Sequence, residues 1–367
     1  MLKRPRPIFL FATCLLVGAA LAVGAGSLPK RASLPDLLDT PTQTSDFASK
    51  GATSGIARRG ERLIAVGPRG LILLSNDGAK QWKQVPSPIS SDLVSVKFVD
   101  ANTAWAVGHD AVALRTTDGG ATWQKVLDGR SVLTLLRETY SARAKMGDAA
   151  AESLLREIER STAQSATPDV LPAPFLDVWF ADNGEGYLVG AFGLVLHTND
   201  GGKRWEPWMD RLENERQFHL YGVTGEGAQR YIVGEQGLLL QLDAAANRFV
   251  KVNTPYNGTF FGADVRGERL LVYGLRGNAF ARLNADAPWN KIETGIDANL
   301  VASVTLPDDR LLLLSQSGHV LAVAADLSRS VVLKTGASAD VLGAVAVGPK
   351  SIALARVNGV GTLALEP

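Results

Sequence analysis

The sequence predicts an all-β fold: a single seven-bladed β-propeller of four-stranded blades, with one helical hairpin inserted between blades two and three. Three observations predict it. A unit of about 40 residues recurs along the chain, a glycine-rich turn recurs within each unit, and a turn with Asp, Gly and Trp closes the earlier units. The 367 residues include 37 glycines and 46% apolar residues, which suits one large ring with many tight turns and a substantial core.

The repeat is clearest in three stretches: Leu63–Val85 (LIAVGPRGLILLSNDGAKQWKQV), Ala104–Val126 (AWAVGHDAVALRTTDGGATWQKV) and Gly186–Trp208 (GYLVGAFGLVLHTNDGGKRWEPW). The second glycine of a G-x-x-G turn marks the register of every unit, and it falls at Gly70, Gly193, Gly237, Gly277, Gly318 and Gly359, with Ala111 in its place in the second unit. Neighbouring positions are 40 to 44 residues apart, except for one interval of 82 that holds an insertion. Seven units of this period predict seven blades, within residues 52–367.

The turn before the last strand of each early unit follows the Asp-box pattern S/T-x-D-x-G-x-x-W. It reads T-T-D-G-G-A-T-W at Thr116–Trp123, T-N-D-G-G-K-R-W at Thr198–Trp205 and S-N-D-G-A-K-Q-W at Ser75–Trp82. We expect the carboxylate to accept hydrogen bonds from its own turn and the indole to pack between neighbouring blades. The residues with this structural role are Asp77, Trp82, Asp118, Trp123, Asp200 and Trp205.

Residues 129–172 form the insertion, and their apolar residues recur at helical spacing in Ser131–Arg143 and Ala149–Arg160. Gly147–Asp148 is the expected break between two helices. The link between blades lies on the same face as the G-x-x-G turns, so we expect the hairpin there. Its candidate binding residues are Leu133, Leu136, Tyr140, Arg143 and Arg156. Alternatively, the apolar stripe attaches the hairpin to the ring.

The G-x-x-G turns are the main candidate binding surface, because loops on a rigid scaffold often carry function. Their side chains differ from blade to blade, where a purely structural turn could repeat one pair. The candidates are Arg69, His109, Asp110, Phe192, Glu235 and Arg276. Phe192 stands out because a surface turn has no structural need for an aromatic residue, and Trp208 is a weaker candidate.

The N-terminus predicts an export signal or an N-terminal anchor over residues 1–26. Lys3, Arg4 and Arg6 precede an apolar run from Ile8 to about Val23, and small residues follow. This places the protein in the periplasm or otherwise outside the cytoplasm. Residues 27–51 have no repeat partner, and we expect them to supply the missing outer strand of the last blade and so to close the ring.

The units L-x-x-V-x-F, W-A-V-G and T-x-D-G-G-x-T-W resemble the photosystem II assembly and stability factor family of propellers, in its branch from non-photosynthetic bacteria. The resemblance covers about residues 52–365. It implies a non-catalytic, exported scaffold without a cofactor that helps a membrane protein complex to assemble or operate. An exporter of the RND or MMPL class is one such partner. The helical hairpin departs from the photosynthetic members, and a closed ring needs no second copy to cover an edge.

The alternative function is an Asp-box glycoside hydrolase of the sialidase kind, or a glycan-binding propeller. Sialidase chemistry needs an arginine triad, a tyrosine activated by a glutamate, and an acidic aspartate at one mouth of the ring. The candidates are Arg69, Arg276, Arg356, Glu235, Asp110, Tyr221 and Tyr273, none within a signature motif. The four histidines lack metal-ligand spacing, and the net charge of +1 does not favour a nucleic acid partner.

Overall fold

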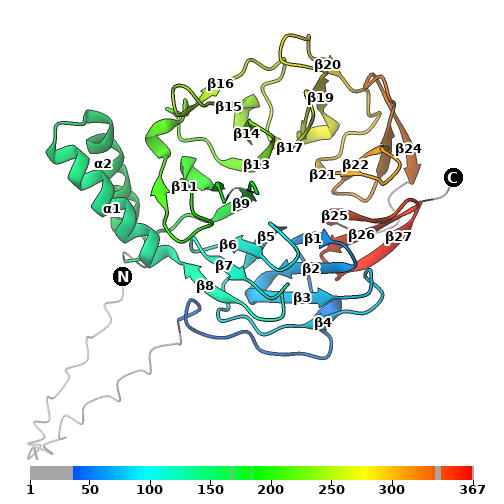
Figure 1. The fold of residues 1–367 in the computed structure, drawn as a ribbon, viewed down its shortest axis with the longest axis horizontal. Coiled ribbons are helices and arrows are strands. Elements are labelled where there is room, and N and C mark those ends of the chain that lie inside the picture. Colours follow the sequence, from blue (N-terminus) through cyan, green and yellow to red (C-terminus); the bar gives the residue numbers. More distant parts are fainter. Residues whose placement is uncertain (1–35, 166, 168, 183, 335–339, 366–367) are drawn as a thin grey trace, which may run out of the picture. The chain divides into compact units, whose positions relative to one another are not determined.

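The computed structural model describes residues 36–165, 167, 169–182, 184–334 and 340–365, and the predicted export signal lies outside them. Residues from Asp36 onward form one compact unit. This unit contains seven antiparallel sheets arranged in a ring and two helices on its outer edge (Figure 1). The all-β class, the seven sheets and the helical hairpin agree with the sequence prediction.

The first three sheets follow the chain in order. Sheet 1 contains β1 (Gly55–Arg59), β2 (Arg62–Gly67), β3 (Leu71–Ser75) and β4 (Lys83–Gln84). Sheet 2 contains β5 (Leu93–Phe98), β6 (Ala104–Gly108), β7 (Ala113–Thr116) and β8 (Gln124–Leu127). Sheet 3 contains β9 (Phe175–Phe180), β10 (Gly186–Gly190), β11 (Val195–Thr198) and β12 (Glu206–Pro207).

The remaining sheets repeat the same antiparallel order. Sheet 4 contains β13 (Leu220–Glu226), β14 (Gln229–Gly234), β15 (Leu239–Asp243) and β16 (Arg248–Lys251). Sheet 5 contains β17 (Phe260–Arg266), β18 (Arg269–Gly274), β19 (Ala279–Arg282) and β20 (Asn290–Lys291). Sheet 6 contains β21 (Leu300–Thr305), β22 (Leu311–Ser315), β23 (Val320–Val323) and β24 (Ser330–Lys334). Sheet 7 contains β25 (Val341–Gly348), β26 (Ser351–Arg356) and β27 (Gly361–Ala364).

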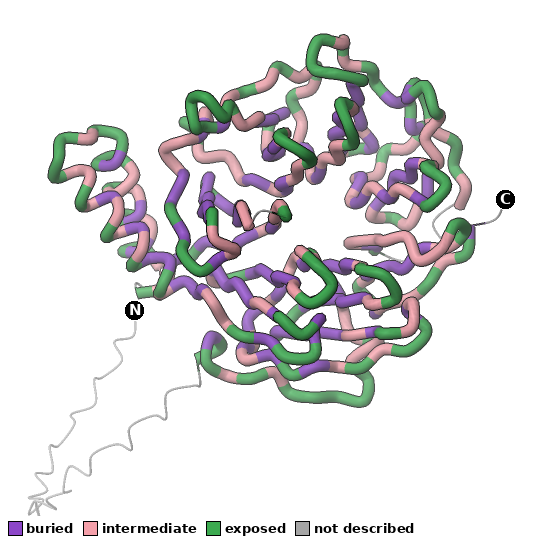
Figure 2. The backbone as a smooth tube through the Cα atoms, in the orientation of Figure 1, coloured by how far each residue is buried: buried purple, intermediate pink, exposed green. Residues whose placement is uncertain are grey.

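The first strand of each sheet lies on the inner side of the ring. These strands contact one another in the order β1, β5, β9, β13, β17, β21 and β25, and β25 contacts β1 again. The second strands are the most buried, because a neighbouring sheet covers each of their faces; β6 and β10 are buried throughout. Figure 2 shows the buried residues along the strands and the exposed residues in the turns. Core clusters therefore lie between adjacent sheets.

The Asp-containing turns have the hydrogen bonds that the sequence predicts. Asp118 accepts hydrogen bonds from the hydroxyl of Thr116 (2.7 Å) and the backbone N–H of Thr122 (2.9 Å). The Thr122 hydroxyl also donates to Asp118 and is the main reason why the pKa of this carboxyl falls to about 2. Asp77 and Asp200 accept equivalent bonds. Trp123 packs between sheets 1 and 2, and Trp205 between sheets 2 and 3.

The insertion forms α1 (Gly129–Lys145) and α2 (Ala149–Ala163). A capping box starts α1: Asp128 accepts from the backbone N–H of Ser131, whose hydroxyl accepts from the N–H of Asp128. Asp148 caps α2 with its side chain, which accepts hydrogen bonds from the backbone N–H groups of Ala150 and Ala151. The helices contact β12 and the short 3-10 helix η4 (Met209–Arg211), and Figure 1 shows them at the periphery of the ring.

The described part of the N-terminal segment does not form the expected outer strand, and residues 27–35 of this segment lie outside the described residues. Residues 36–51, here called the N-terminal strap, contain turns and the 3-10 helix η1 (Ala48–Lys50), and sheet 7 has three strands. The strap instead makes single, scattered hydrogen bonds to several sheets. Thr42 donates its backbone N–H to the carbonyl of Ser87 (3.0 Å), and Val360 donates to that of Ser49 (3.2 Å). A helical turn lacks the extended run of donors and acceptors that a ladder requires.

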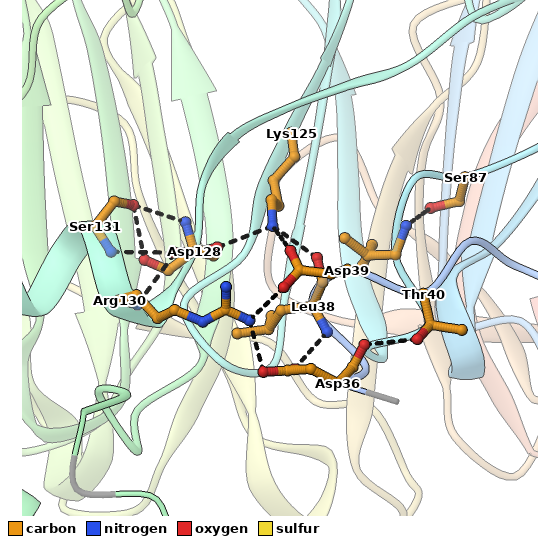
Figure 3. Close-up of polar contacts among 10 residues, drawn as sticks. Asp36, Leu38, Asp39, Thr40, Ser87, Lys125, Asp128, Arg130 and Ser131 are labelled. Atoms are coloured by element: carbon orange, nitrogen blue, oxygen red, sulfur yellow. Dashed lines mark hydrogen bonds and ion pairs between the residues drawn. The ribbon is translucent and has the colours of Figure 1, made fainter. Parts of the chain in front are cut away.

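The start of the strap is held by charge (Figure 3). Lys125 donates to the carbonyl of Leu38 (2.6 Å) and the carboxylate of Asp39 (2.9 Å). Arg130 donates to Asp36 (2.6 Å) and to Asp39 (2.9 Å). Between these contacts, the Leu38 side chain is 3% exposed and packs in the core cluster of sheets 1 and 2. The strap thus fastens sheets 1, 2 and 7 and the beginning of α1 from outside.

Candidate binding surface

The G-x-x-G turns have one shared backbone conformation in sheets 1 to 5. Four of them form short 3-10 turns, which are η2 (Pro68–Gly70), η3 (Ala191–Gly193), η5 (Glu235–Gly237) and η6 (Leu275–Gly277). The residue before the second glycine position has a φ of 53° to 57°, and these residues are Arg69, Asp110, Phe192, Gln236 and Arg276. Positive φ is unfavourable for a residue with a Cβ. The fold therefore holds a strained position while its side chain varies.

Side chains of the next sheet hold three of these turns. The backbone N–H of Arg69 donates to Asp92 (2.8 Å), that of Phe192 to Nδ1 of His219 (2.9 Å), and that of Arg276 to Asn299 (3.1 Å). Each acceptor directly precedes the buried leucine that begins an inner strand, at Leu93, Leu220 or Leu300. These hydrogen bonds were not predicted from the sequence, although in all three cases the acceptor residue stands one position before that leucine.

The six candidate residues in the turns differ in exposure and in whether their side chains are hydrogen-bonded to the protein. Arg69, His109, Phe192 and Arg276 are exposed. Glu235 accepts a hydrogen bond from the backbone N–H of His219 (2.8 Å), so its carboxylate is engaged within sheet 4. Asp110 accepts a hydrogen bond from the Ser91 hydroxyl. These two residues are thus tied into the scaffold, while the four exposed side chains remain available to a partner.

Three of the hairpin candidates are buried and cannot contact a partner. Leu133 (1% exposed), Leu136 and Tyr140 (both 0%) pack with Trp105 and Phe175 in the core. The apolar stripe attaches the hairpin to the ring, as the alternative interpretation proposed. Burial also raises the pKa of Tyr140.

The two arginines of the hairpin behave differently. Arg143 donates to Asp148 (2.7 Å) and Asp210 (2.9 Å), and the bond to Asp210 is the main reason that its pKa is raised. It joins the start of α2 to η4. Arg156 is exposed and pairs within α2 with Glu152. Trp208 was expected at the surface, but it is 3% exposed because Tyr187 and Phe249 surround its ring.

The inner strands enclose a central cavity of about 380 Å³. Its lining includes Asp177, which accepts from the Ser95 hydroxyl (2.7 Å) and the Val223 N–H (3.1 Å). Asp264 also lines it, and burial raises the pKa of this carboxyl. Burial also raises the pKa of Tyr273 to about 12. The charged residues of this lining are Lys97, Asp177 and Asp264, so the cavity is polar.

The arginines of the sialidase interpretation belong to three different sheets. Arg69 and Arg276 lie in the turns that follow β2 and β18, and Arg356 ends β26. Tyr273 is buried (7% exposed), and Tyr221 faces the central cavity. In the described part of the chain, no three His, Cys, Asp or Glu side chains gather to hold a metal ion. None of the described helices has the length and apolar character to span a membrane.

Comparison with known proteins confirms the family resemblance. The family model described as photosynthesis system II assembly factor YCF48 matches residues 61–136 and 164–257. The photosystem II assembly lipoprotein Ycf48 of Synechococcus sp. (strain CC9902) is 31% identical over 100 residues, which are 27% of this chain and 28% of that protein. The aligned segment thus spans less than a third of this relative.

Solved structures show the likeness of the fold. A structure of YCF48 bound to D1 peptide superposes with a TM-score of 0.61 at 14% identity, covering 91% of this chain and 99% of that one. The WD40 β-propeller domain of Doa1 gives a TM-score of 0.60 at 9% identity, covering 88% and 95%. The ring of sheets is therefore propeller-like.

Proposed function

We propose that this chain, a propeller of the photosystem II assembly factor kind, is a non-catalytic binding scaffold that is exported and works on a membrane protein. The observation that carries the proposal is the set of turns in sheets 1 to 5. One strained backbone conformation presents four kinds of side chain, which are those of Arg69 and Arg276, Asp110, Phe192 and Gln236. A rigid frame with variable exposed residues suits recognition of another molecule.

The proposed architecture is one closed seven-bladed propeller in which each sheet is a blade. The contact between β25 and β1 supports closure, because it brings the last sheet against the first. Closure without a fourth strand in sheet 7 is supported by the hydrogen bonds between Thr53 and Arg356 (2.9 and 3.0 Å). The Asp-box turns with their indoles stabilise this frame and lie away from the proposed binding turns.

The names of the relatives support a membrane-associated role. The Synechococcus relative is called an assembly lipoprotein, and a solved YCF48 holds a D1 peptide. We therefore infer that the partner of this chain is a membrane protein and that residues 1–26 direct export or anchoring. An exporter of the RND or MMPL class stays a prediction, because these names concern photosystem II and give an exporter no support.

The test is affinity capture of the tagged protein from membranes of its own host, with mass spectrometry of the captured proteins. The variant changes Phe192 and Arg276 together to Ala. We expect it to lose most of the captured membrane protein while its thermal unfolding stays close to the parent's, since both side chains are exposed. The matched control changes exposed Phe47 and Arg248 to Ala and should capture like the parent.

Two results would contradict the proposal: capture of no membrane protein by the parent, or equal capture by the double variant. Deletion of the hairpin is a poor substitute for these point changes. It would uncover the apolar surfaces of Trp105 and Phe175 that Leu133, Leu136 and Tyr140 now bury.

A further inference from the structure

Phe192 is the one apolar residue among the five strained turn positions. Its side chain is 54% exposed, whereas the equivalent residues are two arginines, an aspartate and a glutamine. The centroids of the Phe192 and His219 rings are 4.7 Å apart in an edge-on arrangement. The same histidine accepts a hydrogen bond from the backbone N–H of Phe192. The aromatic ring is thus fixed in position and left uncovered. An exposed aromatic that is held rigidly has the character of a binding anchor.

Two cavities meet at Phe192 and Met209, between α2 and sheet 3. The first has a volume of about 400 Å³ and the second about 290 Å³. Helix α2 lines the first with Ile158 and the second with Leu154, one turn apart on a single face. We call this surface the α2 groove, and its principal residues are Leu154, Ile158, Phe192, Leu194, Met209 and Leu212. The thioether of Met209 can adapt to different contacts.

The groove exists only because the hairpin stands beside sheet 3. The family match stops at residue 136 and resumes at 164, so it leaves out the second half of α1 and all of α2. The wall that α2 contributes is therefore an addition of this chain to the matched frame. A partner that uses this wall would be selected by features outside the family match.

The charged residues that line the groove are all acidic, and basic residues beside the groove pair with them. The lining of the two cavities includes Glu157, Asp210 and Glu215 and no Lys, Arg or His. Asp210 is engaged by Arg143. Glu157 and Glu215 lie in exposed ion pairs with Arg160 and Lys251. Exposed pairs of this kind contribute little, so a cation from a partner can take their place.

We propose that the α2 groove binds a polypeptide segment of the partner that inserts a bulky apolar side chain beside Phe192 and sets a Lys or Arg against Glu157 or Glu215. This inference rests on the proposed scaffold function and specifies its ligand. The cavity volumes are in the range of sites that bury side-chain-sized groups. The apolar contact supplies affinity, and the acidic rim selects against acidic segments.

The test uses a random dodecapeptide library displayed on phage and selected on the full chain. Enriched sequences are then synthesised with a fluorophore, and their Kd is measured by anisotropy. We expect the enriched peptides to share a bulky apolar residue with a nearby Lys or Arg. Phe192→Ala should weaken binding about tenfold or more, as loss of a central anchor does. Glu157→Lys with Glu215→Lys should also weaken it. Phe47→Ala should not, because Phe47 is an exposed phenylalanine outside the groove.

Several outcomes would overturn the inference. One is no enrichment, and another is equal binding of the enriched peptides to the parent and to Phe192→Ala. Binding of phosphatidylglycerol vesicles that Phe192→Ala abolishes would assign the groove to lipid. Dimerisation that the same variant abolishes would assign it to a second copy. If Arg276→Ala alone impairs membrane capture while the peptide result is negative, the scaffold function stands and only the groove assignment fails.

Discussion

Sheets 1 to 3 differ from sheets 5 and 6 in the turn that precedes the last strand. In the early sheets, the turn before the last strand has an aspartate cap and a tryptophan, and Trp123 and Trp205 are 7% and 8% exposed. In sheet 5, Asn284 accepts from the N–H of Ala287 (2.8 Å), and Trp289 is only partly buried. In sheet 6, Asp326 caps its turn without a tryptophan.

The difference shows which part of the motif the fold requires. A local cap survives in sheets 5 and 6, because any side-chain oxygen at this position can satisfy the turn. The indole of Trp289 in sheet 5 packs less deeply than those of Trp123 and Trp205, as Trp82 in sheet 1 also does. In sheet 6 the buried Leu327 packs between sheets 5 and 6 instead. Caps are local and replaceable, whereas inter-sheet packing depends on both partners.

The largest expected effect is on stability, and it comes from removing the tryptophan of one early and one late sheet. Trp123→Ala removes a buried ring between two sheets and should cost about 3–5 kcal/mol of the free energy of unfolding. Trp289→Ala should cost about 1–2 kcal/mol, since part of its ring is already in water. Urea unfolding of both variants measures the difference, with Trp123→Phe as the volume control. Equal costs would mean that the two rings have the same packing role.

The N-terminal strap offers a second test, because its described contacts are with sheets 1, 2 and 7 and the start of α1. Leu38→Ala should cost about 2–4 kcal/mol, as truncation of a buried leucine does. Its neighbour Leu37 is 55% exposed and provides the control, for which we expect less than about 0.5 kcal/mol. Thermal unfolding reads out both. If the two leucines cost the same, the strap does not pack as described.

The smallest effect concerns acid. The hydroxyl of Thr122 leads the hydrogen bonds that lower the pKa of Asp118 to about 2 from an ordinary value of 3.8. A lowered pKa stabilises the folded protein above the unfolded-state value and loses that contribution as pH falls from about 4 to 2. Asp118→Asn should therefore cost about 1 kcal/mol at pH 6, after allowance for its exposure, and progressively less below pH 4. Asp286→Asn in sheet 5 is the control, and a loss that is independent of pH would contradict this account.

The frame could be predicted from the sequence, because strands, turns and caps repeat locally. The second glycine of the turn has a positive φ from Gly70 to Gly359, and Ala111 has it too, at 48°. The hairpin residues could not be assigned in the same way. An apolar stripe such as Leu133 and Leu136 has the same spacing whether it faces a core or a partner.

Contacts between residues far apart in the chain could not be predicted either. The hydrogen bonds from Phe192 to His219 and from Lys125 to Asp39 join residues that share no sequence pattern. The strap was expected to be a strand because the last blade lacked one. A missing strand in a repeat predicts that something covers the gap, and it does not predict which conformation does so.

The seam of the ring has a consequence for the order of events during synthesis. Thr53 and Arg356 are 303 residues apart in the chain, yet they hydrogen-bond to each other. The side of sheet 1 that faces sheet 7 can therefore be covered only after nearly the whole chain has been synthesised. The strap precedes sheets 1 and 2 in the chain and can already shield their outer side during that interval. The N-terminal strap adds no strand to sheet 7, but it is placed to protect sheets 1 and 2 while the rest of the chain is still being synthesised.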